Sequence, residues 1–183
     1  IEQDTISENW KSLPRDGIVA FANETQNSRI AVGETLAPNY QVRMVFTRYE
    51  GPCGVGLVLP LGSGKQVSLE MDASNGSKTV LGDENYGVLT EYDGPLLTTG
   101  VRQMCLVTVE NKLDWTRIRI TLDGRKLIDY NGPTADLHCD PKWASKPGRL
   151  GVGVHKLVSA QIHELSVRSF TGDLAESRPA TLP

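Results

Sequence analysis

Apolar residues recur at every second position along most of this chain, and this pattern limits its fold more than any other feature. Between residues 40 and 47, for example, Val42, Met44 and Phe46 alternate with polar neighbours. Because successive side chains of a β-strand point to opposite faces, the alternation indicates strands with one buried face. Gly, Pro, Asn and Asp interrupt the pattern about every ten residues, as in a sandwich or a barrel. The expected strands are residues 18–21, 29–32, 40–47, 55–59, 67–72, 104–110, 117–122, 125–130, 150–154 and 159–168.

Local signals agree with an all-β chain. Asp123-Gly124 separates two of these strands and is typical of a type I′ hairpin turn. The parity of the apolar positions changes between Ile162 and Leu165, which predicts a β-bulge or a strand covered on both faces. The best helical candidates, residues 5–13 and 135–143, are short. The sequence therefore argues against parallel β-α-β winding.

Length and charge limit the number of domains and the class of partner. A chain of 183 residues fits one domain, and we expect residues 1–172 to form a single β-sandwich and residues 173–183 a polar tail. Lysine and arginine number 19 against 22 acidic residues, so the net charge of −3 argues against nucleic-acid binding. No apolar run approaches the roughly 20 residues that cross a bilayer, so no membrane span is expected. The first residue is Ile1, which indicates a processed chain or part of a longer protein.

Metal and cofactor motifs are incomplete. The three cysteines allow at most one disulfide and form no C-x-x-C pair, and His138-Cys139-Asp140 is interpreted as a loop. The segment 62–65 lacks the first glycine and the final Ser or Thr of a phosphate loop. We therefore predict no metal and no cofactor. A structural calcium ion is kept as an alternative, with the loop acids Asp83, Glu84, Asp93 and Asp136 as its candidate ligands.

Three segments carry a family resemblance: NYQVRMVFTRYEGPCGVGLVLPLG, RIRITLDGRKLIDYNGP and GRLGVGVHKLVSAQIHELSVRSFTGD. Together they resemble domains of the concanavalin A-like lectin/glucanase superfamily over residues 40–172, near bacterial 3-keto-disaccharide hydrolase-like domains. The resemblance implies a jelly-roll sandwich of two antiparallel sheets, one of them concave. It also implies that ligands bind on the concave face or at its rim loops. These segments are structural rather than catalytic, so the fold transfers better than the function.

One pair of carboxylates bears on catalysis. Laminarinase-like hydrolases of this superfamily carry an E-x-D-x-E or E-x-D-x-x-E strand, which Glu70 and Asp72 resemble. The last acid is missing, because Ser74 and Asn75 stand in its place. Alternation predicts that Glu70 and Asp72 share one face, but retaining hydrolysis needs a second carboxyl about 5–5.5 Å away. An enzyme would need an acid from another strand; otherwise both residues are solvated positions on a strand face.

Glycines and arginines suggest a binding groove. Four glycines lie opposite the apolar residues of their strands, where a missing side chain marks close approach by a ligand or by a neighbouring Trp or Tyr. These glycines are Gly54, Gly56, Gly151 and Gly153. On the ligand interpretation they floor a groove whose walls include Arg43, Arg117 and Arg119. Tyr92 and Trp143, both in polar segments, are the expected exposed aromatics for stacking on sugar rings.

These features favour a noncatalytic jelly-roll module that binds a glycan or a protein surface. We expect it to be part of a larger extracytoplasmic bacterial protein, periplasmic or secreted. One alternative is a carbohydrate-active enzyme, a glycoside hydrolase or lyase, that uses Glu70 and Asp72. The other is a structural or assembly domain without a small ligand.

Overall fold

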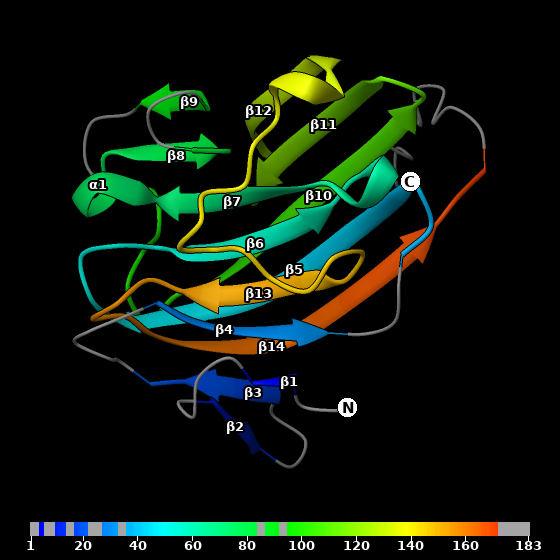
Figure 1. Cartoon of the computed structure of the whole chain (residues 1–183). Helices are drawn as coiled ribbons and strands as arrows, with labels where there is room; N and C mark the ends of the chain where they lie inside the picture. The colour runs from blue at the N-terminus through cyan, green and yellow to red at the C-terminus, as the bar shows by residue number, and fades with distance from the viewer. Residues whose placement is uncertain are drawn as a thin grey trace, which may run out of the picture.

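The chain folds into two antiparallel β-sheets that pack face to face (Figure 1). The structure is a computed structural model and describes residues 4–5, 10–13, 17–21, 27–32, 36–83, 87–91 and 95–171. Within these residues each sheet has seven strands. The strands of sheet A, in spatial order, are β1 (Asp4–Thr5), β4 (Ser28–Val32), β13 (Leu150–Val154), β6 (Val55–Pro60), β7 (Gln66–Asp72), β8 (Lys78–Leu81) and β9 (Val88–Glu91). Those of sheet B are β12 (Arg125–Pro133), β11 (Trp115–Leu122), β10 (Arg102–Lys112), β5 (Tyr40–Glu50), β14 (Ser159–Ser169), β3 (Gly17–Ala20) and β2 (Trp10–Leu13). In the described part of the chain, three short helical turns lie between strands: η1 (Gly62–Gly64), α1 (Ala73–Gly76) and η2 (Thr134–Asp136).

The hydrophobic core lies between the sheets and consists of the alternating apolar residues. Met44 and Phe46 of β5 are fully buried, as are Leu57 of β6 and Leu69 of β7 in the opposite sheet. Burial of each such side chain contributes roughly 1.5–3 kcal/mol, so the inward row of every strand helps to hold the two layers together.

The ten expected strands and the all-β fold class are confirmed. Asp123 and Gly124 both have positive φ and join β11 to β12, as the hairpin prediction requires. A register shift between Ile162 and Glu164 confirms the bulge. The two helical candidates are wrong: residues 10–13 form β2, and residues 135–143 contain only the end of η2 followed by turns. The tail predicted at residues 173–183 lies outside the described residues.

The two sheets differ on their outer faces. Residues 137–149, which connect η2 to β13, cross the outer face of sheet A (Figure 1). The backbone N–H of Asp140 donates to Ser68 Oγ (3.0 Å), and Gln66 Nε2 donates to the Lys146 carbonyl (2.6 Å). On the outer face of sheet B, by contrast, Arg43 and Arg117 remain partly exposed to solvent. No helix in the described part of the chain is long and apolar enough to span a membrane.

Candidate functional site

Two of the glycines predicted to floor a groove lie on the outer face of sheet A, beneath Trp143. Gly56 and Gly153 are direct register partners on neighbouring strands. A Cβ atom at Gly153 would lie 2.5 Å from the Trp143 ring, and one at Gly56 would lie 3.1 Å from it. The indole thus packs against both glycine backbones, and Trp143 is only 1% exposed. The expected exposed position of Trp143 is wrong, because this side chain fills the space that a ligand would need.

The other two glycines of the predicted floor are covered by the protein as well. A Cβ atom at Gly54 would overlap the carbonyl oxygen of Met71, and one at Gly151 would lie 2.8 Å from Val58 Cβ. These glycines therefore allow strands and a crossing segment to approach closely. Cover by a neighbouring aromatic residue, the alternative to a ligand, therefore holds for Gly56 and Gly153, whereas backbone and aliphatic atoms cover Gly54 and Gly151.

Glu70 anchors this cover rather than lining an open cleft. Its Oε2 atom accepts a hydrogen bond from Trp143 Nε1 at 2.9 Å, and the residue is 7% exposed. A buried carboxylate is costly unless it is hydrogen-bonded, so the indole N–H and the carboxylate satisfy each other.

Asp72 is directed elsewhere, and the predicted shared face of the two carboxylates is wrong. Its φ of 57° is left-handed, so the strand alternation ends at this residue. Its carboxylate, with the residue 0% exposed, pairs with Arg48 Nη1 of sheet B at 3.1 Å. It also accepts the backbone N–H groups of Leu96 (2.7 Å) and Leu97 (2.9 Å). Asp72 thus serves a buried ion pair, and neither acid of the hydrolase hypothesis faces an open cleft.

The arginines predicted as groove walls lie on the opposite side of the molecule from the glycines. Arg43 is on β5 and Arg117 and Arg119 are on β11, all facing outward from sheet B. The glycines belong to sheet A, so one groove cannot contain both sets, and that part of the prediction is wrong. We call the outer face of β12, β11, β10, β5 and β14 the polar face.

Three ion pairs cross the strands of the polar face. Arg43 pairs with Glu164, Arg117 Nε lies 3.5 Å from Asp129 Oδ1, and Arg119 Nη2 lies 2.6 Å from Glu110 Oε1. Each pair joins neighbouring strands, which limits the rotamers of the arginines. The guanidinium groups remain partly exposed and carry five N–H donors each, so they can still donate to a ligand.

Trp115 completes this surface and was not among the predicted site residues. It lies two residues before Arg117 on the same face of β11 and is 47% exposed. Its Nε1 atom donates to Asn131 Oδ1 of β12 at 2.8 Å, which fixes the orientation of the indole. A held, half-exposed indole beside paired arginines and carboxylates offers both an apolar surface and hydrogen-bonding groups.

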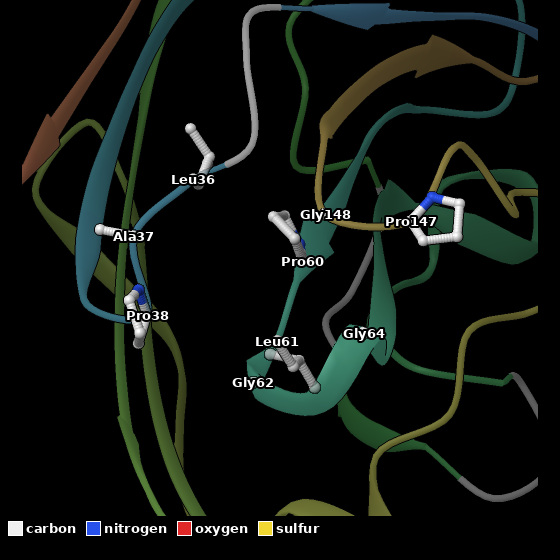
Figure 2. A pocket seen from close by; sticks show the side chains of 9 residues that line it. All are labelled: Leu36, Ala37, Pro38, Pro60, Leu61, Gly62, Gly64, Pro147 and Gly148. Carbon is white, nitrogen blue, oxygen red and sulfur yellow. The ribbon is translucent and has the colours of Figure 1, made fainter.

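A pocket of about 340 Å³ opens at one end of the sandwich (Figure 2). Leu36 and Pro38 face Pro60 and Leu61 across it, and Pro147 closes a further side (Figure 2). The N–H of Leu36 donates to the Gly148 carbonyl at 3.1 Å and joins two walls. None of the nine lining residues carries a charged side chain, so this pocket offers few groups that could orient a polar ligand.

The remaining predicted positions contribute little to a site. Tyr92, Glu84 and Asp93 lie outside the described residues. Among the residues that are described, no group of three or more His, Cys, Asp or Glu side chains could hold a metal ion.

The described cysteines are free thiols, and burial raises the pKa of Cys139 to about 11 and that of Cys105 to about 12. At neutral pH these two thiols are therefore poor nucleophiles.

No protein-family model matches the sequence, and no curated protein matches it either. Several solved structures, however, resemble this chain in fold. The carbohydrate-binding module CBM66 from Bacillus subtilis superposes with a TM-score of 0.60 at 17% identity, over 91% of this chain and 95% of that one. A B. subtilis protein of unknown function with a galectin-like fold gives a TM-score of 0.61 at 10% identity, over 92% and 88%. The apo Crh5 transglycosylase gives 0.58 at 11% identity, over 93% and 79%. At these identities the likeness concerns the fold, and the chain has the concanavalin A-like jelly-roll fold that its sequence predicts.

Proposed function

We propose that this chain is a noncatalytic glycan-binding module that uses the polar face of sheet B. The proposal includes the expected setting, a larger extracytoplasmic bacterial protein. The observation that carries it is the half-exposed Trp115, held by Asn131 beside the ion-paired Arg117 and Arg119. The likeness to a carbohydrate-binding module supports the same function.

The groups on this face suit a sugar. One face of a sugar ring presents C–H groups that pack on an indole, while the hydroxyls at its edge donate and accept hydrogen bonds. Arginines supply donors there, and Asp129 supplies an acceptor. Because the ion pairs hold these side chains before a ligand arrives, binding loses less side-chain entropy.

The enzyme alternative has weaker support in the geometry. Glu70 is bonded to Trp143 and Asp72 to Arg48, and both carboxylates are buried. On the polar face, each of the three carboxylates on the described strands is held in an ion pair with an arginine. We therefore infer binding without hydrolysis.

The test compares the Trp115→Ala variant with the wild type on a glycan array and then by calorimetry. We expect wild-type binding to at least one glycan and a loss of affinity of about tenfold in the variant, because stacking on the indole is removed. Phe21→Ala is the matched control, because Phe21 is an aromatic residue that is 44% exposed and lies far from Trp115. Phe21 directly follows β3, and three strands, β14, β5 and β10, lie between β3 and β11 in the sheet. Silence of the wild type on the whole array, or equal losses in both variants, would contradict the proposal.

A further inference from the structure

The polar face carries an excess of positive charge, although the whole chain has a net charge of −3. Residues paired in antiparallel register point to the same face, so the register of the five strands shows which side chains face outward. Among the described residues of these strands, seven cationic side chains and three carboxylates do so. The cationic residues are Arg43, Arg102, Lys112, Arg117, Arg119, Lys126 and Arg168, and the carboxylates are Glu110, Asp129 and Glu164.

The three carboxylates do not balance this charge. Each forms one of the ion pairs described above, with Arg43, Arg117 or Arg119. Seven cations against three carboxylates leave a surplus of four positive charges. Lys126 and Arg168 take part in none of these three pairs, and both are exposed. An exposed surplus of this kind attracts negatively charged ligands at moderate ionic strength.

The surplus spans the sheet rather than one point. Arg168 of β14 lies in one cross-strand row with Gln41, Thr108 and Arg119. Lys126 lies on β12, at the other side of the face. Four strand spacings separate β14 from β12, roughly 19 Å. A single anionic group cannot contact both ends, whereas a chain with repeated negative charges can.

We propose that the ligand of this face is an acidic polysaccharide, with carboxylate groups on successive sugars. This inference rests on the proposed function, because it concerns the same surface. Guanidinium groups bind carboxylates with paired N–H donors, and five of the seven outward cationic residues are arginines. Trp115 stacks on a sugar ring, while Arg168 and Lys126 attract the charges of neighbouring units.

The experiment measures calorimetric affinities of the full chain for polygalacturonate, neutral dextran and polyglutamate at several salt concentrations. The test variant is Arg168→Glu with Lys126→Glu. The control, Lys65→Glu with Lys156→Glu, changes the net charge equally at exposed positions outside the polar face. We expect tighter binding of polygalacturonate than of either other polymer, an affinity that falls as salt rises, and a loss of about tenfold or more in the test variant alone.

Other outcomes separate this inference from the proposed function. Equal, salt-independent binding of dextran and polygalacturonate would overturn the acidic-ligand proposal and leave glycan binding intact. Equal binding of polyglutamate, or equal losses in the two double variants, would show a general response to charge and overturn it as well. Absence of binding to every glycan, on the array and in solution, would overturn both.

Discussion

At the scale of single residues, two tryptophans show how context decides the role of a side chain. Trp143 lies in a polar segment yet is 1% exposed, whereas Trp115 opens a regular strand and is 47% exposed. Both indole N–H groups have a side-chain partner, Glu70 for Trp143 and Asn131 for Trp115. The difference lies beneath the rings, because Trp143 packs on two glycines that have no Cβ atom to hold it away from the sheet.

Substitution of Gly153 tests that packing. In Gly153→Ala the new methyl group would lie 2.5 Å from the Trp143 ring and 3.0 Å from the Ser28 carbonyl oxygen. We expect the free energy of unfolding, measured by urea titration, to fall by about 1–3 kcal/mol. Gly62→Ala is the control, because its Cβ would meet only Asn111 Cβ at 3.9 Å, and its effect should stay within about 0.5 kcal/mol. Equal effects of the two substitutions would show that Trp143 does not occupy this position.

At the scale of elements, the buried pair of Arg48 and Asp72 ties the sheets together. Arg48 comes from β5 of sheet B and Asp72 from the end of β7 in sheet A. The guanidinium also donates to the carbonyls of Cys53 and Leu97. The pair thus also holds the β5–β6 connection, which contains Cys53, and the β9–β10 connection, which contains Leu97. The left-handed backbone of Asp72 turns its carboxylate toward these partners and away from the face that Glu70 occupies.

Asp72→Asn should therefore be strongly destabilising. The substitution leaves the Arg48 guanidinium buried without its counter-charge, and removal of one partner of a buried pair costs about 3–5 kcal/mol. Asp129→Asn removes the acid from an exposed pair and should cost less than about 1 kcal/mol. Both values come from urea unfolding monitored by tryptophan fluorescence. A cost for Asp72→Asn as small as that for Asp129→Asn would mean that the pair does not hold the sheets together.

The sequence predicts the elements better than their neighbours in space. Alternation identifies the outward residues of each strand, and this part of the prediction holds for both Gly56 and Arg43. It does not say to which sheet a strand belongs, because inward and outward residues alternate in the same way in both sheets. The groove prediction failed at this step: β6 and β5 lie in different sheets. Trp115 could have been predicted as a site residue from the sequence. It stands two residues before Arg117 and four before Arg119, so alternation places all three on the same face of the strand.

At the scale of the whole molecule, the core contains groups that ionise at high pH. Tyr40 is fully buried and its hydroxyl donates to the Pro60 carbonyl at 2.8 Å, and burial raises its pKa well above the ordinary value. Burial, with a smaller contribution from the charge of Asp123, raises the pKa of Cys105 to about 12. These groups stay neutral in the folded protein at pH values where the unfolded chain already ionises.

The sign of the resulting pH dependence follows from linkage. Below pH 9, the ordinary pKa of a thiol, Cys105 is neutral in both states and its contribution to stability is fully present. As the pH rises further, ionisation of the unfolded chain favours unfolding, and the loss continues until the pKa of about 12 is reached. Because one pKa unit corresponds to about 1.4 kcal/mol and half of the unfolded thiols are already ionised at pH 9, Cys105 alone should lower the free energy of unfolding by about 2 kcal/mol between pH 9 and pH 11.

Cys105→Ala isolates this contribution from that of other alkaline groups. We expect the variant to be less stable than the wild type at pH 8, because a core side chain is shortened. From pH 8 to pH 11, however, it should lose about 3 kcal/mol less than the wild type, as measured by urea unfolding at each pH. Tyr40 titrates in both proteins and cancels in the comparison. Parallel losses would mean that the Cys105 thiol is not shielded from water by the two sheets, since shielding is what separates its folded and unfolded pKa values.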